Sequence, residues 1–143
     1  MRPLRITLVV IGIVQIFFGL PFLVAPGLYS LALHLPHAPA WTSWFFAMSG
    51  ARFLAMAYGM FLAARDPIKH KAWINAMIVV QALDWLGTMY SIGTGAITLA
   101  QATDAPYLPL IFVAALLILY PRGSHAATAQ ESARRPSTDA VAR

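Results

Sequence analysis

Two apolar stretches, WFFAMSGARFLAMAYGMFLAA at residues 44–64 and AWINAMIVVQALDWLGTMYSI at residues 72–92, decide the fold of this chain. Each stretch is about as long as the 20 residues that an α-helix needs to cross a bilayer. Each also carries one charged residue, Arg52 or Asp84, that lies 13 residues from the charged loop between the stretches. At about 1.5 Å per helical residue, both charges lie about 20 Å from that loop. The pattern predicts two neighbouring membrane helices with one charge at the same depth in each.

The composition indicates an integral membrane protein. Of the 143 residues, 59% are hydrophobic and 10% are charged, whereas about 25% of the residues in a soluble domain are charged. The length allows one compact domain. The chain contains no cysteine, which excludes disulfides, thiol redox chemistry and thiolate metal sites. The formal net charge is +5, but the basic residues lie in predicted loops and the tail, where membrane topology explains them without nucleic-acid binding.

Two further apolar stretches, at residues 6–24 and 106–120, raise the number of predicted spans to four. All four are expected to be helices, because lipid cannot satisfy open backbone hydrogen bonds. The loops at residues 25–43 and 93–105 contain no Lys or Arg, whereas basic residues flank the opposite ends of the spans. This alternation fits an even number of spans and predicts a four-helix bundle with both termini in the cytoplasm. The fourth span is short, so it either borrows residues before Pro106 or crosses a thinned region.

The boundaries of the membrane domain follow from composition. The four spans place it at residues 1–120, and the polar segment at residues 121–143 is predicted to be a disordered cytoplasmic tail. Proline breaks helices, so the first span is expected to end between Pro21 and Pro26, with a short surface helix at residues 27–35. An alternative interpretation makes the first span a cleaved signal peptide with the preceding arginines as its charged start.

Small residues suggest how the helices pack. They recur at every fourth position of the second span, as Ala47, Ala51, Ala55, Gly59 and Ala63, and the third span has the shorter series Gly87, Ser91 and Gly95. Such stripes let membrane helices approach closely. Arg52 shares a face with Gly59, and Asp84 shares a face with Ser91, since residues seven apart nearly eclipse on a helix. The pattern predicts an intramembrane ion pair between Arg52 and Asp84.

Six residues form a predicted polar interior. They are Gln15, Ser49, Arg52, Gln81, Asp84 and Thr88. Gln15 and Gln81 each lie 10 residues from a flanking basic residue, and Gly12 and Gly19 on the face of Gln15 would let the first span come close. One interpretation is a structural ion pair that fixes helix register. The other is a binding or proton-handling site, since an arginine can hold a carboxylate, phosphate or quinone oxygen.

The sequence offers little else for chemistry. His34 and His37 in the first outer loop have a spacing that can share a metal, but no third ligand lies nearby, so they are interpreted as solvated loop residues and no metal site is predicted. No histidine lies within a span, which argues against an intramembrane haem. There is no nucleophile–histidine–acid set and no phosphate-binding glycine loop, so no catalytic residue is predicted.

Two short motifs carry a resemblance to a known family. They are Gly19 followed by the break Phe22-Leu23-Val24-Ala25-Pro26, and Gly50-Ala51-Arg52 early in the second span. With the short basic loop that follows, the chain over residues 6–120 resembles small bacterial four-helix inner-membrane proteins of the DoxX-like family, which implies a location in a bacterial inner membrane. Many members have no known activity, and some are membrane subunits linked to quinone-dependent sulfur oxidation. The resemblance implies a quinone near Arg52 or Asp84 by analogy.

The sequence contains more small-residue helix surface than potentially reactive side chains. Two functional hypotheses follow. The first is a non-enzymatic accessory subunit of a membrane complex, which packs against a protein partner or a second copy of itself through small-residue helix faces. The alternative is a binding site for a quinone, a lipid or a transported solute, centred on Arg52 and Asp84. The residues themselves predict no cofactor, and the lipid bilayer is the one partner that every interpretation shares.

Overall fold

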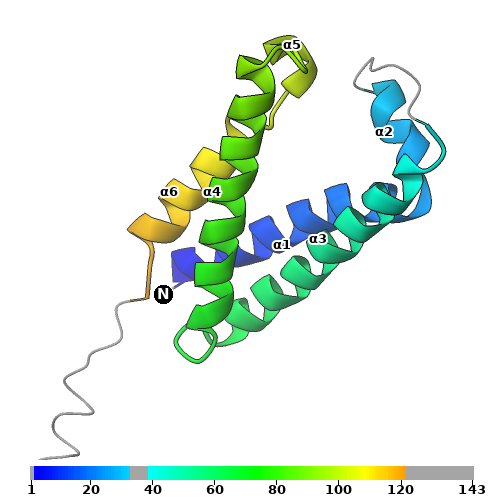
Figure 1. The fold of residues 1–143 in the computed structure, drawn as a ribbon. Helices are drawn as coiled ribbons and strands as arrows, with labels where there is room; N and C mark the ends of the chain where they lie inside the picture. The colour runs from blue at the N-terminus through cyan, green and yellow to red at the C-terminus, as the bar shows by residue number, and fades with distance from the viewer. Residues whose placement is uncertain (1, 33–38, 122–143) are drawn as a thin grey trace, which may run out of the picture.

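The protein is all-helical over residues 2–32 and 39–121, the part of the chain that the computed structural model describes. No strand occurs in this part. The helices, which Figure 1 shows in order, are α1 (Arg2–Val24), α2 (Pro26–Ala32), α3 (Thr42–Arg65), α4 (Lys71–Gly93), α5 (Leu99–Ala102) and α6 (Leu108–Ile118). The predicted all-α fold class is confirmed for the described residues.

The helix boundaries agree with those expected from proline positions and hydropathy. α1 contains Pro21 and ends at Val24, within the interval predicted for its end. α2 begins at Pro26, and it covers the start of the predicted surface helix. The rest of that segment and both outer-loop histidines, His34 and His37, lie outside the described residues. The predicted disordered tail also lies outside them from residue 122 onward.

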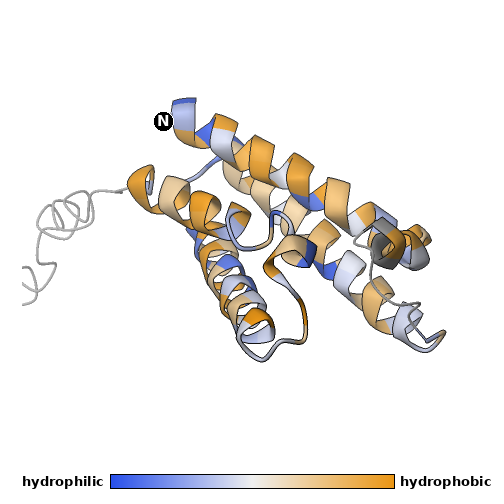
Figure 2. Ribbon diagram, turned by 90° about the horizontal axis from the view of Figure 1, so that it is seen from above, coloured by the Kyte–Doolittle hydropathy of each residue, from blue (hydrophilic) through white to orange (hydrophobic). Residues whose placement is uncertain are grey.

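Two helices of the described part, α1 and α3, are long and apolar enough to cross a membrane. α4 is also 23 residues long, but Asn75, Gln81 and Asp84 interrupt its apolar sequence. α6 has 11 residues, which gives a length of about 16 Å against a hydrocarbon layer of about 30 Å. Hydrophobic residues predominate along α1 and α6 (Figure 2). Large apolar side chains stay exposed on all of these helices, among them Phe17, Leu83 and Ile118.

The four longer helices are arranged as two pairs. α1 and α3 run antiparallel and lie side by side along most of their length, and α4 packs against α6 (Figure 1). The two pairs meet near the turn at residues 66–70 and diverge away from it (Figure 1). α3 and α4, although joined by a short turn, therefore contact each other mainly near that turn.

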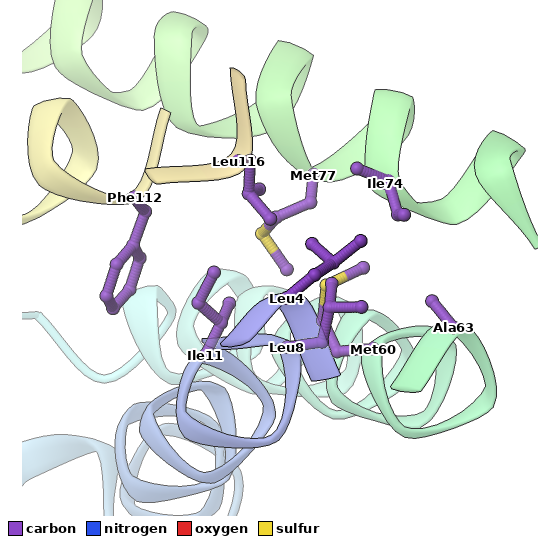
Figure 3. Packing of buried hydrophobic residues seen from close by; sticks show 9 residues of the cluster. All are labelled: Leu4, Leu8, Ile11, Met60, Ala63, Ile74, Met77, Phe112 and Leu116. Atoms are coloured by element: carbon purple, nitrogen blue, oxygen red, sulfur yellow. The ribbon is translucent and has the colours of Figure 1, made fainter. Parts of the chain in front are cut away.

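The hydrophobic core lies where the two pairs meet. Nine buried side chains from all four helices form it (Figure 3): Leu4, Leu8, Ile11, Met60, Ala63, Ile74, Met77, Phe112 and Leu116. These residues belong to the N-terminal halves of α1 and α4, the last two turns of α3, and the middle and end of α6. A hydrogen bond of 2.7 Å from the Tyr120 hydroxyl to Asn75 Oδ1 joins the end of the α6 segment to α4. Packing is therefore concentrated at the end of the molecule that carries the charged turn.

Two glycines bring the backbones of α1 and α3 into contact. A Cβ atom on Gly50 would lie 2.7 Å from the carbonyl oxygen of Gly19, and a Cβ atom on Gly19 would lie 2.8 Å from Phe53 Cβ. Neither position has room for a side chain, because the opposing atoms are backbone or the first atom of a side chain. Gly12, where a Cβ would lie 3.0 Å from the Phe61 ring, extends this close contact. The glycines of α1 thus allow the close approach that the sequence predicts.

The predicted small-residue stripes are used only in part. On α3, Gly59 and Ala63 are buried, whereas Ala51 and Ala55 are exposed. A Cβ atom on Gly59 would overlap the Trp73 indole ring, so this glycine lets α4 approach α3 near the turn. On α4, nothing lies within 4 Å of a Cβ atom built on Gly87. The stripe on α4 is therefore not a packing face in this fold.

We predict that Gly50→Ala destabilises the protein by about 1–3 kcal/mol, because the added methyl group collides with the α1 backbone. The matched control is Gly87→Ala, which adds the same methyl group to open space on α4. That control is expected to leave stability unchanged or to raise it by up to about 1 kcal/mol through helix propensity. Unfolding in detergent, followed by circular dichroism, measures both. Equal stability of the two variants would contradict the α1–α3 contact.

Candidate functional site

The six predicted polar residues line two adjoining cavities where the helix pairs diverge. The smaller cavity has a volume of about 250 Å³ and is lined by Gln15, Gln81, Asp84 and Thr88, among others. The larger has a volume of about 430 Å³ and is lined by residues that include Gln15, Ser49, Arg52 and Asp84. The structure therefore brings all six side chains together, although they come from three helices.

Three residues belong to both cavities. Gln15 from α1, Phe53 from α3 and Asp84 from α4 line the smaller and the larger one alike. Phe53 also packs against Phe22, with ring centroids 5.8 Å apart. The two cavities are consequently two parts of one site. Arg52 lines only the larger part, and Gln81 and Thr88 line only the smaller part.

Gln15 has an unsatisfied hydrogen-bond acceptor in this site. Its side chain is 3% exposed, and its Nε2 donates a long bond of 3.5 Å to the sulfur of Met77, which is a weak acceptor. Its Oε1 has no hydrogen-bond partner among the described residues. Leaving a buried acceptor unpaired costs about 1–3 kcal/mol, so such an atom calls for an explanation. Gln81, which is 5% exposed, lines the same small cavity.

The predicted ion pair between Arg52 and Asp84 is not formed. Within the described part of the chain, no nitrogen of Arg52 lies within 4.0 Å of a carboxylate oxygen of Asp84. Both side chains are exposed and both line the larger cavity. The reason is the divergence of α3 and α4, which increases with distance from the turn. Equal depth in two neighbouring helices therefore does not bring two side chains into contact.

Thr88 does not bind the Asp84 carboxylate, although it lies one turn away. Its hydroxyl donates a hydrogen bond of 2.9 Å to the backbone carbonyl of Asp84. Ser91 makes the equivalent bond of 2.9 Å to the carbonyl of Gly87. Such bonds to the preceding turn use the hydroxyl hydrogen and leave the oxygen lone pairs free. Thr88 consequently presents an acceptor, and no donor, to the smaller cavity.

Sequence reasoning missed Asp104, a second carboxylate of the smaller cavity. It lies between α5 and α6, and the Thr103 hydroxyl donates a hydrogen bond of 2.8 Å to its Oδ1. Thr103 has a φ of 51°, a conformation that is unfavourable for a β-branched residue and that accompanies the sharp turn here. The available signal was that Asp104 is the one charged residue of the loop at residues 93–105. Nothing in the sequence placed that loop against α4.

The apolar part of the smaller cavity was also not foreseen. Four aromatic rings line it, those of Phe18, Phe22, Phe53 and Phe112. Phe18 and Phe22 are one turn apart on the face of α1 that carries Gln15. Phe53 and Phe112 come from α3 and α6, so no periodicity within one stretch groups all four rings. The cavity therefore combines an aromatic wall with a few polar groups, which is typical of small-molecule sites.

The described residues contain no group of three or more His, Asp or Glu side chains placed to hold a metal ion. The polar residues of the two cavities include no histidine, and Ser49 and Thr88 are their hydroxyl groups. The arrangement can therefore hold a polar or charged group by hydrogen bonds and charge, but it supplies no activated nucleophile.

Comparisons of this chain with known protein-family models, with curated proteins and with solved structures gave no match. The function proposed below therefore starts from the geometry of the two cavities.

We predict that Arg52→Leu and Asp84→Leu affect stability almost independently, because the two side chains do not touch. The interaction energy from the double-mutant cycle should be below about 1 kcal/mol. A directly paired buried arginine and aspartate would instead make each single variant about 3–5 kcal/mol less stable, with rescue in the double variant. Unfolding free energies of the wild type, both single variants and the double variant decide between these outcomes.

Proposed function

We propose that this protein is a four-span protein of a bacterial inner membrane that binds a small amphiphilic molecule between its helix pairs. Two spans, α1 and α3, meet the length and hydropathy needed for crossing. α4 is of similar length, and its apolar residues Val79 and Leu86 are exposed. The short α6 crosses together with its flanking residues or in a thinned region, and both termini lie in the cytoplasm.

The four-span topology predicts opposite locations for the two ends of α4. Because the chain contains no cysteine, single cysteines can be introduced by Lys69→Cys in the turn before α4 and by Thr98→Cys in the loop after it. A membrane-impermeant maleimide should label the second variant in intact spheroplasts and the first only after permeabilisation. Labelling of both variants from the same side would show that α4 does not cross.

One observation carries the binding function: Arg52 and Asp84 lie deep in apolar helices, are unpaired with each other, and both line the larger cavity. A charge at this depth is costly in lipid unless a partner or a water-filled cavity compensates it. The unsatisfied Oε1 of Gln15 adds an unpaired acceptor to the same place. A molecule with a polar head and an apolar body satisfies these groups and also fills the apolar lining.

The occupant of the larger cavity is expected to carry an oxygen that accepts from Arg52. A lipid headgroup, a transported solute and a quinone all provide such an oxygen. The resemblance to DoxX-like proteins favours a quinone among these. No reaction is proposed, since the site offers charge and hydrogen bonds but no nucleophile or base in a recognisable set.

A role as accessory subunit is a second candidate, and the unused part of the α3 stripe favours it. Ala51 and Ala55 remain exposed while Gly59 and Ala63 are buried, and the space around Gly87 on α4 is open. A helix of a partner protein, or of a second copy of this chain, could pack there. This partner would close the space between the diverging helices from outside.

Native mass spectrometry of gently extracted protein tests both functions. We expect a bound small molecule on the wild type, reduced at least several-fold in Ala55→Phe, because Ala55 lines the larger cavity. The matched control, Ala51→Phe, places the same ring one turn away on α3, outside both cavities.

The two functions predict different losses in this experiment. Equal retention of a small molecule in both variants would contradict binding in the cavity. Loss of a protein partner in both variants, with no small molecule in any sample, would favour the accessory role instead.

A further inference from the structure

We infer that the smaller cavity binds a primary ammonium group carried on an apolar, preferably aromatic, stem. This inference rests on the proposed binding function and names the ligand class for one half of the site. In the larger cavity, Arg52 binds an oxygen of the same molecule or of another one.

The charge of the smaller cavity is negative. Asp84 from α4 and Asp104 from the turn before α6 both line it. Among the described residues, no Lys, Arg or His lines this cavity, since Arg52 belongs to the larger one alone. Two carboxylates lining one cavity without a cationic side chain attract a cation and repel an anion.

The hydrogen-bonding capacity of the cavity points to a donor. Oε1 of Gln15, in a side chain that is 3% exposed, has no partner. Thr88 has used its hydroxyl hydrogen on the Asp84 carbonyl, and Asp104 accepts from Thr103 with one oxygen and keeps acceptor capacity on the other. A primary ammonium group provides three N–H donors and no acceptor, which matches these groups.

The rest of the lining sets the character of the stem. The rings of Phe18, Phe22, Phe53 and Phe112 line the same cavity as the two carboxylates. Aromatic faces attract a cation within about 6 Å and also bury an apolar or aromatic body. A volume of about 250 Å³ suits a small amine better than a large ring system. A hydrated inorganic cation would leave this aromatic wall unused.

Two sources could present this chemistry: a free lipophilic amine, or the headgroup of an aminophospholipid. Both carry a primary ammonium group, and both can enter from the membrane or its outer surface. The experiment separates them by changing the lipid. Phosphatidylcholine carries a quaternary ammonium group, which has no N–H donor. Phosphatidylethanolamine carries a primary ammonium group, which has three N–H donors.

The test uses the full chain in phosphatidylcholine nanodiscs and tritiated 2-phenylethylamine as the probe. The wild type should bind the probe saturably, and 2-phenylethanol, which has the same stem without the charge, should not compete. Asp84→Asn and Asp104→Asn should each weaken binding about tenfold or more, the effect expected when one charge-assisted hydrogen bond is lost. Gln15→Leu should also weaken it, through loss of the unpaired acceptor.

The matched control is Asp66→Asn, which changes the net charge equally. Asp66 lies in the turn between α3 and α4, where its Oδ1 accepts from the backbone N–H of Lys69 at 3.1 Å, and it lines neither cavity. This variant should bind the probe as the wild type does. Circular dichroism and gel filtration of every variant confirm folding, and the competition with 2-phenylethanol needs no variant at all.

The lipid arm identifies the source of the ammonium group. If phosphatidylethanolamine in the nanodisc displaces the probe, the headgroup is the ligand; if it does not, a free amine is. Both outcomes support the inference.

Wild-type protein that does not bind the probe, or variants of both carboxylates that bind it unchanged, would overturn the inference. Competition by 2-phenylethanol would overturn it equally. If native mass spectrometry then still finds an anionic or neutral molecule that Ala55→Phe releases, the proposed function stands and only the ligand class is wrong.

Discussion

The backbone contact between α1 and α3 is the constraint on which the rest of this structure depends. Gly19 and Gly50 face each other so closely that a Cβ on Gly50 would lie 2.7 Å from the opposing carbonyl oxygen. In lipid, helices associate through such close packing, because no hydrophobic force drives them together. α3 therefore packs against α1 along most of its length. It contacts α4 mainly near the turn, where Gly59 accommodates the Trp73 ring. The two helix pairs diverge because α3 contacts α1 over a much longer stretch than it contacts α4.

That divergence divides the molecule into two ends with different roles. The apolar core, with side chains such as Leu8, Met60 and Leu116, holds all four helices at the end of the charged turn. At the other end the helices leave two cavities, and the polar side chains line them with few partners of their own. Unpaired acceptors such as Gln15 Oε1 reduce stability, and proteins commonly retain such groups where a ligand satisfies them. The apolar core and the cavities thus lie toward opposite ends of the same helices, and the α1–α3 backbone contact at Gly19 and Gly50 continues along the cavity end.

The sequence predicted much of the site and little of its geometry. The six polar residues stood out because each is unusual inside an apolar stretch, and all six do line the cavities. The prediction of an Arg52–Asp84 ion pair was wrong, because the depth of two residues along their helices does not define the angle between those helices. Asp104 was missed because it lies in a loop whose position depends on how α5 and α6 fold back. The four-span topology and the resemblance to DoxX-like proteins remain predictions.

The sequence by itself determined the helices, their approximate ends, and the length and hydropathy that let α1 and α3 cross a membrane. These are local properties: hydropathy adds up along a stretch, and proline and glycine act on their own backbone. Only the tertiary structure decided that α3 pairs with α1 rather than with α4, and that two carboxylates from distant segments share one cavity. Pairing depends on whether two particular backbones can approach within a few ångströms, which is a property of both helices together. No single stretch of sequence carries that information.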